Sequence, residues 1–138
     1  MGACRPEGQS QAPSLDYPAA MAFELEPDFT GEWYGEIAGR PGTMLLGELN
    51  VGQLYGSFES DDSEVELVLL LDQIVLDLGT GGSAQANRSD FTWQDGRGSR
   101  GIGWLMINRE DTAITGDYGY GQRITGEGGW SFIRVDDG

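Results

Sequence analysis

The side chains of this chain best suited to binding chemistry are aromatic. Indole and phenol rings stack on planar ligands, and their N–H and O–H groups donate hydrogen bonds. Tyr118 and Tyr120 share one face of an expected strand, where they offer hydroxyls to a ligand if they face inward, or an aromatic patch to a partner if they face outward. The alternative for the four tryptophans is that they fill the core and plug the ends of the fold. The candidate ligand- or partner-binding residues are Trp33, Tyr34, Trp93, Trp104, Tyr118, Tyr120 and Trp130.

Catalytic chemistry has little support in the residue types present. The chain contains no His, which removes the commonest general base and the commonest metal ligand. A Ser nucleophile, or the single cysteine Cys4, therefore lacks a His partner. A pair of carboxylates acting as acid and base remains open, but with 23 Asp and Glu a close pair means little. We expect a non-catalytic protein without a cofactor, and the alternative is a small-ligand-modifying barrel enzyme of the isomerase or cyclase type.

Two groups of acidic residues have alternative interpretations. Glu59, Asp61, Asp62, Glu64 and Glu66 crowd one expected turn, as a solvated hairpin tip or as ligands for calcium, although the spacing of an EF-hand is absent. Glu32 and Glu36 share a strand face with Tyr34, opposite Trp33. They are surface charges if Trp33 points inward; if it points outward, they enter the interior and favour a cationic or polyhydroxylated ligand.

The net charge of −15 excludes classes of partner. Binding to nucleic acid requires the neutralisation of phosphates, and an acidic surface is repelled by anionic lipid. All eight basic residues are Arg. The absence of Lys indicates either a GC-rich genome or adaptation to high salt, where an acidic surface stays soluble. The sequence Gly79-Thr80-Gly81-Gly82 is not a phosphate-binding loop, because no Lys and no helical pattern follow it.

The elements that must position these residues are β-strands. The 138 residues form one domain with 23 Gly, about 17% against a usual ~7%, spread between and within apolar runs as in all-β proteins. Apolar residues alternate with period two, and no segment has a convincing helical period. The long apolar stretch 65–78 is either two strands divided near Asp72 or one long bent strand, and 79–89 is expected to be a loop. The other expected strands are 31–37, 43–50, 53–60, 90–95, 101–108, 113–121 and 128–135.

Short strands joined by hairpin-length connections predict an all-β fold, an antiparallel up-and-down meander barrel of about eight strands. We expect the first and last strands, 31–37 and 128–135, to pair and close the barrel, which leaves no exposed sheet edge. The barrel domain is expected to span residues 29–138, after a flexible or extended N-terminal tether over 1–28 that holds four of the five prolines.

Near the start of that tether, Gly2-Ala3-Cys4 is similar to the end of a bacterial lipobox, in which the Cys is lipidated. The hydrophobic signal segment and the usual Leu are missing, and Met1 would then be a cloning start. A Gly2 and Cys4 pair also resembles a eukaryotic dual-acylation motif, although Pro6 occupies the position that prefers Ser or Thr. The remaining alternative is a free thiol in a disordered tail. We expect Cys4 to be the only membrane attachment.

The strand motifs resemble those of a known class of barrel. Residues 29–35 are similar to the opening strand of avidin-like and lipocalin-like (calycin-type) barrels, and 54–60 to the third strand of streptavidin-type proteins. Residues 114–121, with Trp130 and Arg134, resemble the closing part of small bacterial barrel lipoproteins. The resemblance implies a calycin-like barrel lipoprotein. Biotin binding does not carry over, because Gly35 and Phe58 stand where the avidin site has a polar residue and a Tyr, and only Ser60 matches.

The sequence therefore predicts a non-catalytic, extracytoplasmic β-barrel, with a lipid anchor to the cell envelope where Cys4 is acylated. It would bind a protein partner or a small hydrophobic or aromatic ligand, and it could be an accessory subunit of a larger assembly. A polar-lined pocket would favour ligand binding or the enzyme alternative. A filled barrel with an exposed aromatic patch would favour an accessory subunit that acts through its surface.

Overall fold

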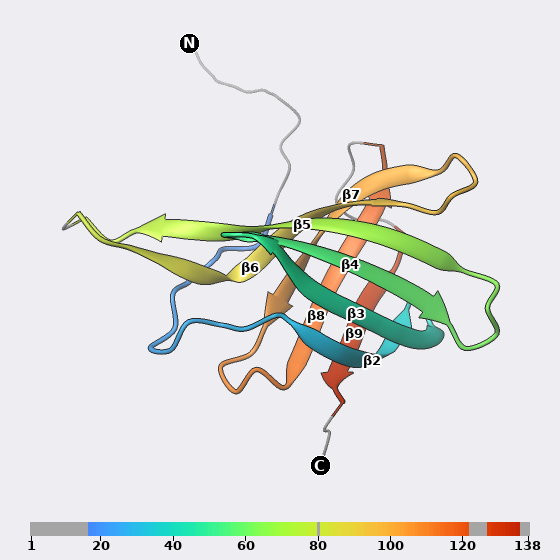
Figure 1. Cartoon of the computed structure of the whole chain (residues 1–138), viewed down its shortest axis with the longest axis horizontal. Helices are drawn as coiled ribbons and strands as arrows, with labels where there is room; N and C mark the ends of the chain where they lie inside the picture. Colours follow the sequence, from blue (N-terminus) through green and yellow to red (C-terminus); the bar gives the residue numbers. More distant parts are fainter. Residues whose placement is uncertain (1–16, 80, 122–126, 136–138) are drawn as a thin grey trace, which may run out of the picture.

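The computed structural model describes residues 17–79, 81–121 and 127–135, and the fold in them is all-β (Figure 1). The described residues contain no helix, and so none long and apolar enough to cross a membrane. Eight strands follow one another along the chain. They are β2 (Gly31–Ile37), β3 (Arg40–Asn50), β4 (Gln53–Ser60), β5 (Glu66–Asp77), β6 (Ser83–Gln94), β7 (Arg100–Ile107), β8 (Ala113–Tyr120) and β9 (Gly129–Arg134).

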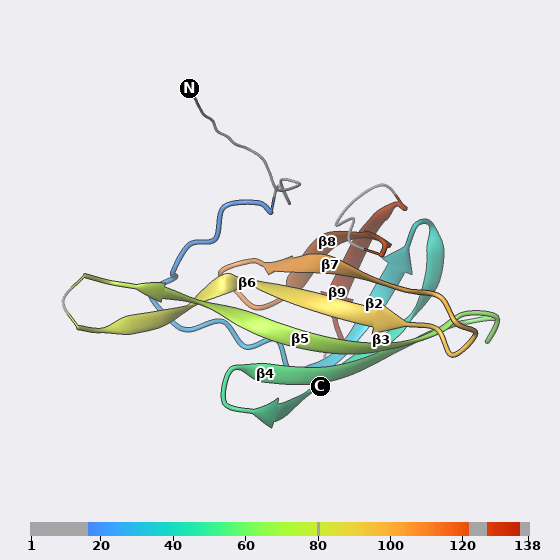
Figure 2. The same cartoon turned by 90° about the horizontal axis from the view of Figure 1, so that it is seen from above.

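Each strand pairs antiparallel with the next, and β2 pairs with β9, so the sheet is a closed up-and-down barrel. The register places Trp33 opposite Arg134 and Ile37 opposite Trp130. The predicted fold class and the predicted pairing of the first and last strands are both confirmed. Figure 2 shows the β5–β6 hairpin extending well beyond the other strands at one end of the barrel.

The prediction of a loop over 79–89 is wrong for most of its length. β6 already begins at Ser83, and Gln85 pairs with Val75 of β5. Small and polar residues fill this part of β6, so it lacks the apolar alternation of the other strands. The stretch 65–78 forms one long strand, β5, with a register shift between Gln73 and Val75 near the expected division. β3 starts at Arg40, three residues earlier than expected.

Side chains fill the barrel interior. Alternate residues of each strand point inward, and the largest fully buried side chains include Trp33, Trp130, Phe58 and Phe132. Trp33 thus points inward, while Glu32, Tyr34 and Glu36 lie on the outer face. Close strand approach depends on glycine at Gly35, where an added Cβ would lie 1.9 Å from the carbonyl oxygen of Ser131.

The N-terminal segment reaches the end of the barrel remote from the β2–β3 turn. Phe29 is buried in the core, and its carbonyl accepts a hydrogen bond from Trp33 Nε1 at 3.0 Å. Further upstream, the amide of Met21 donates to Asn87 Oδ1 at 2.8 Å, and Ala22 forms an isolated antiparallel bridge with Ala86. Residues 21–29 therefore run from the edge of β6, beside Ala86, to the end of the barrel at which β2 begins, which we call the closed end because Phe29 is buried in it.

Candidate functional site

The opposite end of the barrel carries a pocket of about 380 Å³, which we call the mouth pocket. It lies where the β2–β3, β4–β5 and β6–β7 turns and the end of β8 converge. In an up-and-down meander every second turn lies at the same end of the barrel. The fold therefore brings together residues of these turns that are far apart in sequence. The lining includes Ile37, Phe58, Val65, Leu67, Trp93, Tyr118 and Tyr120, with Arg40, Arg97, Glu64, Glu66 and Asp95 as charged members.

An aromatic cluster forms one wall of the mouth pocket. The Trp93 ring meets the rings of Tyr118 and Tyr120 edge to face, at centroid distances of 5.6 and 5.2 Å. Trp93 Nε1 donates to the Gly119 carbonyl oxygen at 3.0 Å, which fixes the indole between the two tyrosines. Gly101 is required beside it, because an added Cβ would lie 2.7 Å from Trp93 Nε1.

The two tyrosines differ in burial. Tyr118 is partly buried and also meets Trp130 at a centroid distance of 5.7 Å, and burial raises the pKa of its phenol. Tyr120 is 49% exposed. Tyr118 thus links the pocket wall to the core, while Tyr120 presents an aromatic surface to solvent at the pocket. Truncating each should therefore affect a different property of the protein.

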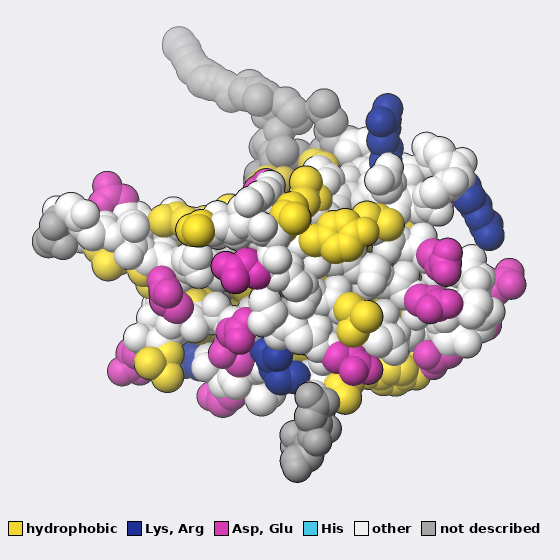
Figure 3. Space-filling model, in the orientation of Figure 1, with side chains coloured by type: hydrophobic (Ala, Val, Ile, Leu, Met, Phe, Trp, Pro, Cys, Tyr) yellow, Lys and Arg dark blue, Asp and Glu magenta, His cyan; other side chains and the backbone are white. Residues whose placement is uncertain are grey.

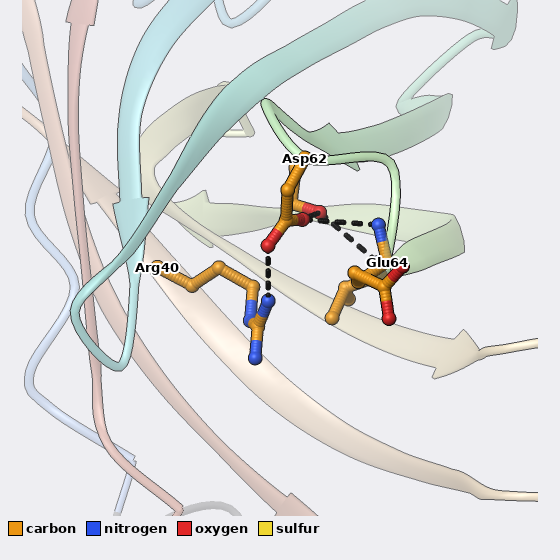
Figure 4. Close-up of polar contacts among 5 residues, drawn as sticks. Arg40, Asp62 and Glu64 are labelled. Atoms are coloured by element: carbon orange, nitrogen blue, oxygen red, sulfur yellow. Dashed lines mark hydrogen bonds and ion pairs between the residues drawn. The ribbon is translucent and has the colours of Figure 1, made fainter.

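The β4–β5 turn forms a polar rim held by hydrogen bonds (Figure 4). Asp62 accepts hydrogen bonds from the Ser60 hydroxyl at 2.6 Å and the Glu64 amide at 3.0 Å, and pairs with Arg40 Nη1 at 2.9 Å. The Ser60 bond is the largest cause of the lowered pKa of Asp62, followed by the Glu64 amide, with the Arg40 charge adding to them. The rim of the pocket is thus tied to β3 through Arg40.

The β6–β7 turn is fixed in a similar way. Asp95 Oδ1 accepts the amide hydrogens of Arg97 at 2.8 Å and Ser99 at 3.1 Å, and the Arg97 amide bond is the largest cause of the lowered pKa of Asp95. Arg97 and Arg40 bring two cations to the lining of a pocket in a chain with a net charge of −15. The carboxylates of Glu64, Glu66 and Asp95 also line it. The mouth pocket therefore combines an aromatic wall with a rim that contains both signs of charge.

The structure separates the sequence-predicted site residues into three groups. Trp93, Tyr118 and Tyr120 meet at the mouth pocket, with Trp130 buried behind Tyr118. Trp33 is fully buried, and its indole N–H donates to Phe29 at the closed end of the barrel. The remaining two lie on the outer face: Trp104 is partly buried on β7, and Tyr34 donates its O–H to Asp61.

Sequence reasoning missed the apolar floor and the arginines of the mouth pocket. Phe58 and Leu67 both lie on inward positions of their strands, so the period-two alternation contains a signal for them. Arg40 and Arg97 carry no such signal, because Arg40 is the first residue of β3 and Arg97 lies in the β6–β7 turn, where the alternating pattern does not define the direction of a side chain. Only the arrangement of the hairpins brings these two arginines to one pocket.

The acidic turn of β4–β5 engages its own backbone and neighbouring side chains. Ser63 Oγ donates to Glu59 Oε2 at 3.2 Å, and Asp61 and Asp62 accept from Tyr34 and Arg40. Within residues 17–79, 81–121 and 127–135, no three His, Cys, Asp or Glu side chains come together in a group that could hold a metal ion. The arrangement is that of a hydrogen-bonded hairpin tip.

No family model, curated protein or solved structure shows a significant match to this chain. The barrel alone does not identify an avidin-like or lipocalin-like family, so that resemblance remains an expectation. Cys4, the predicted lipidation site, lies outside the described residues. The geometry that bears on function is therefore that of the mouth pocket and of the outer barrel surface.

Proposed function

We propose that this protein is a non-catalytic binding barrel that holds a small planar or aromatic ligand in its mouth pocket. The observation that supports this most directly is the cluster of Trp93, Tyr118 and Tyr120 beside a cavity of about 380 Å³. That volume lies within the range of ~300–1,000 Å³ typical of small-molecule sites. The exposed ring of Tyr120 offers a surface on which a ligand ring can stack. The apolar side chains of Phe58 and Leu67 line the bottom of the pocket.

The rim favours a ligand that also carries a polar or acidic group. Arg40 and Arg97 supply guanidinium donors, which suit planar carboxylate or phosphate-type groups. Arg40 forms an exposed ion pair with Asp62 at 2.9 Å, which keeps its guanidinium at the rim of the pocket. The nearby Glu64 and Glu66 would oppose a large anion. A mostly apolar ring with one acidic substituent fits this combination best.

The location of this function is part of the same proposal. An acidic barrel outside the cytoplasm, held at the cell envelope through lipidated Cys4, agrees with the lipobox-like Gly2-Ala3-Cys4 and the proline-rich segment after it. In the native host, with the full precursor gene, Cys4→Ser should move the protein from the membrane fraction to the soluble fraction. Unchanged partitioning would contradict the anchor but not ligand binding.

Ligand binding can be tested with the aromatic sulfonate dye anilinonaphthalene sulfonate as a probe, followed by fluorescence and by backbone amide shifts. Tyr120→Ala should weaken binding by about 2 kcal/mol, roughly 30-fold, because it removes an exposed aromatic anchor. Ile133→Ala is the control, since Ile133 is also exposed, at 67%, but lies on the outer face of β9, away from the mouth pocket.

Three results would contradict parts of the proposal. Equal affinity of the Tyr120→Ala variant and the unmodified protein, or amide shifts confined to residues outside the mouth pocket, would remove the ligand site. Turnover of any substrate in an activity screen would contradict the non-catalytic part and favour the isomerase or cyclase alternative.

A further inference from the structure

The outer surface of the barrel carries an apolar stripe that crosses five strands, from β3 to β7. The register aligns Tyr55 with Leu70, Leu70 with Thr92, and Thr92 with Ile102. The neighbouring row runs from Leu45 through Ser57 to Val68. We define the outer apolar stripe by its hydrophobic members, which are Leu45, Tyr55, Val68, Leu70 and Ile102.

The outer apolar stripe is exposed and partly concave. Tyr55 and Leu45 are each 51% exposed, and Leu70 and Val68 are 39% and 38% exposed. A hollow of about 590 Å³, lined by Tyr55, Val68, Leu70 and Ile102, lies over these strands, with Arg100 among its lining residues. Figure 3 shows hydrophobic side chains gathered over β4 and β5 in the middle of this face. Exposed apolar side chains gathered around a hollow, with Ser57 and Thr92 between them, form a candidate interaction site.

Carboxylates border the stripe on both sides. On β5, Glu66, Val68, Leu70 and Asp72 alternate with inward residues, so the outward sequence is acidic, apolar, apolar, acidic. On β4, Glu59 lies directly opposite Glu66, and on β6 Asp90 lies directly opposite Asp72. Glu66 and Asp72, which bound the outward-facing apolar residues of β5, therefore each form a cross-strand pair of carboxylates with a neighbouring strand. Burial is the largest cause of the raised pKa of Asp90, although its pair with Arg88 opposes that shift.

This pattern of charge selects among the possible occupants. A second copy would bring two sets of carboxylate rows together, on chains that each have a net charge of −15. Nucleic acid and anionic lipid are repelled for the same reason. A partner segment with an apolar centre and cationic flanks matches both features of the stripe. An amphipathic helix with Lys or Arg beside its apolar face has that arrangement.

The dimensions agree with a helix. Glu66 and Asp72 are six positions apart on β5, a distance of roughly 20 Å at about 3.3 Å per residue. A helix with side chains is about 10–12 Å wide, so it fits between the carboxylate rows and leaves room for flanking Lys or Arg side chains to reach them. Five strands span roughly 19 Å, about 13 residues of helix.

From these observations we infer that the outer apolar stripe docks a cationic amphipathic helix of a partner protein. Its apolar members Tyr55, Val68, Leu70 and Ile102 face away from the barrel interior, so the stripe lies on the outer side of the wall whose inner side forms the mouth pocket. The two sites adjoin at Glu66, which borders the stripe and also lines the mouth pocket. A barrel that holds a ligand at one end would thereby also be attached to a partner through its side.

The test uses a synthetic Leu/Lys peptide of about 18 residues with a single apolar face, titrated against the full chain by fluorescence anisotropy. Binding should be at least tenfold tighter than that of a peptide with the same composition but no apolar face, which measures attraction by charge alone. It should weaken as salt rises from about 0.15 M to about 1 M, since screening reduces the contribution of the carboxylate rows.

Matched variants locate the site. The Leu70→Ser and Asp72→Asn variants should each lower affinity for the amphipathic peptide several-fold, and the double variant by at least tenfold. Ile133→Ser and Glu36→Gln are the controls, because these residues lie on the outer face of β9 and β2, away from the stripe. Tyr120→Ala should also leave peptide affinity unchanged, which separates this site from the mouth pocket.

Amide shifts on the unmodified chain give an independent measurement if a variant fails to fold. The peptide should perturb residues of β4 to β7 around the stripe. Equal binding of the two peptides, shifts spread over the acidic surface, or shifts confined to the mouth pocket would overturn the inference. A mass measurement could instead show that the chain forms dimers and that the Leu70→Ser variant is monomeric. That result would assign the stripe to a second copy of the chain and would also overturn the inference.

Discussion

The guanidinium of Arg134 lies over the indole ring of Trp33, with its carbon 4.3 Å from the ring centroid. The two residues face each other across the β2–β9 seam that closes the barrel. The same guanidinium donates hydrogen bonds of 2.6 Å to the carbonyl oxygens of Asp28, Thr30 and Asp111. One side chain thus joins the last strand, the N-terminal segment and the β7–β8 turn at the closed end of the barrel.

Replacing Arg134 with Ala should therefore destabilise the whole barrel, by roughly 3 kcal/mol in chemical denaturation. Hydrogen bonds from a charged donor contribute about 1.5–3 kcal/mol each but are not additive. Arg134→Lys should recover less than half of the loss, because a single ammonium cannot reproduce the planar fork that reaches three carbonyls. Arg97→Ala, which removes an exposed side chain, is the control and should change stability by less than about 0.5 kcal/mol. If Arg134→Ala also changed stability by less than about 0.5 kcal/mol, the closed end would be held by packing alone.

A second prediction concerns the glycines at which strands approach closely. Gly35→Ala should destabilise the fold by more than about 3 kcal/mol or prevent folding, because its Cβ would lie 1.9 Å from Ser131 O and 2.6 Å from Phe132 Cα. Gly47→Ala is the matched control, since no atom lies within 4 Å of its added Cβ. In that variant the lost backbone freedom of the unfolded chain should leave stability unchanged or slightly higher. Thermal unfolding of the two variants side by side measures the difference.

These glycines also indicate how much of the fold was predictable. The period-two pattern around Trp33 and Trp130 was enough to predict the strands and the closure of the barrel, because inward and outward residues differ there in polarity. The first half of β6 was missed because Ser83 to Ser89 contains no strongly apolar residue. It is a strand through its pairing with β5 and its contact with the N-terminal segment, and both depend on residues far away in the sequence.

The candidate site was predictable only in part. Tyr118 and Tyr120 were recognised as one face of a strand, and they do face the mouth pocket. On β7 both faces are apolar, so alternation does not indicate whether Leu105 or Trp104 enters the core; the structure buries Leu105. The same ambiguity concealed the outer apolar stripe, because Val68 and Leu70 resemble core residues when β5 is considered alone.

A third prediction concerns the β4–β5 turn at low pH. Because the pKa of Asp62 is lowered in the folded protein, the stabilisation that its charge gives the turn is fully present above the ordinary Asp value of about 3.9. It is lost as the pH falls below that value and through the folded pKa. Hydrogen exchange at the Glu64 amide should therefore lose protection on acidification, beyond the usual pH dependence of exchange. Asp62→Asn should show lower protection already at neutral pH and little further loss, and equal behaviour of the two proteins would contradict the assignment.

The last prediction separates the two tyrosines of the mouth pocket by what each contributes. Tyr118 packs against Trp93 and Trp130, at centroid distances of 5.6 and 5.7 Å, so Tyr118→Ala should cost about 2–3 kcal/mol of stability. Tyr118→Phe keeps the ring, so stability at neutral pH should stay within about 0.5 kcal/mol of that of the unmodified protein. Tyr120 is half exposed, so Tyr120→Ala should weaken binding of the anilinonaphthalene sulfonate probe while the unfolding midpoint changes little.

The double replacement by Ala should then show both effects, a less stable barrel and weaker binding of the probe. Urea unfolding combined with probe titration measures the two quantities on the same samples. If Tyr120→Ala unfolds the barrel, Tyr120 belongs to the core, and the exposed stacking surface on which the proposed ligand site depends does not exist. If Tyr118→Ala leaves stability unchanged, the aromatic wall is not continuous with the core through Trp130, and the pocket would have to be held by its turns alone.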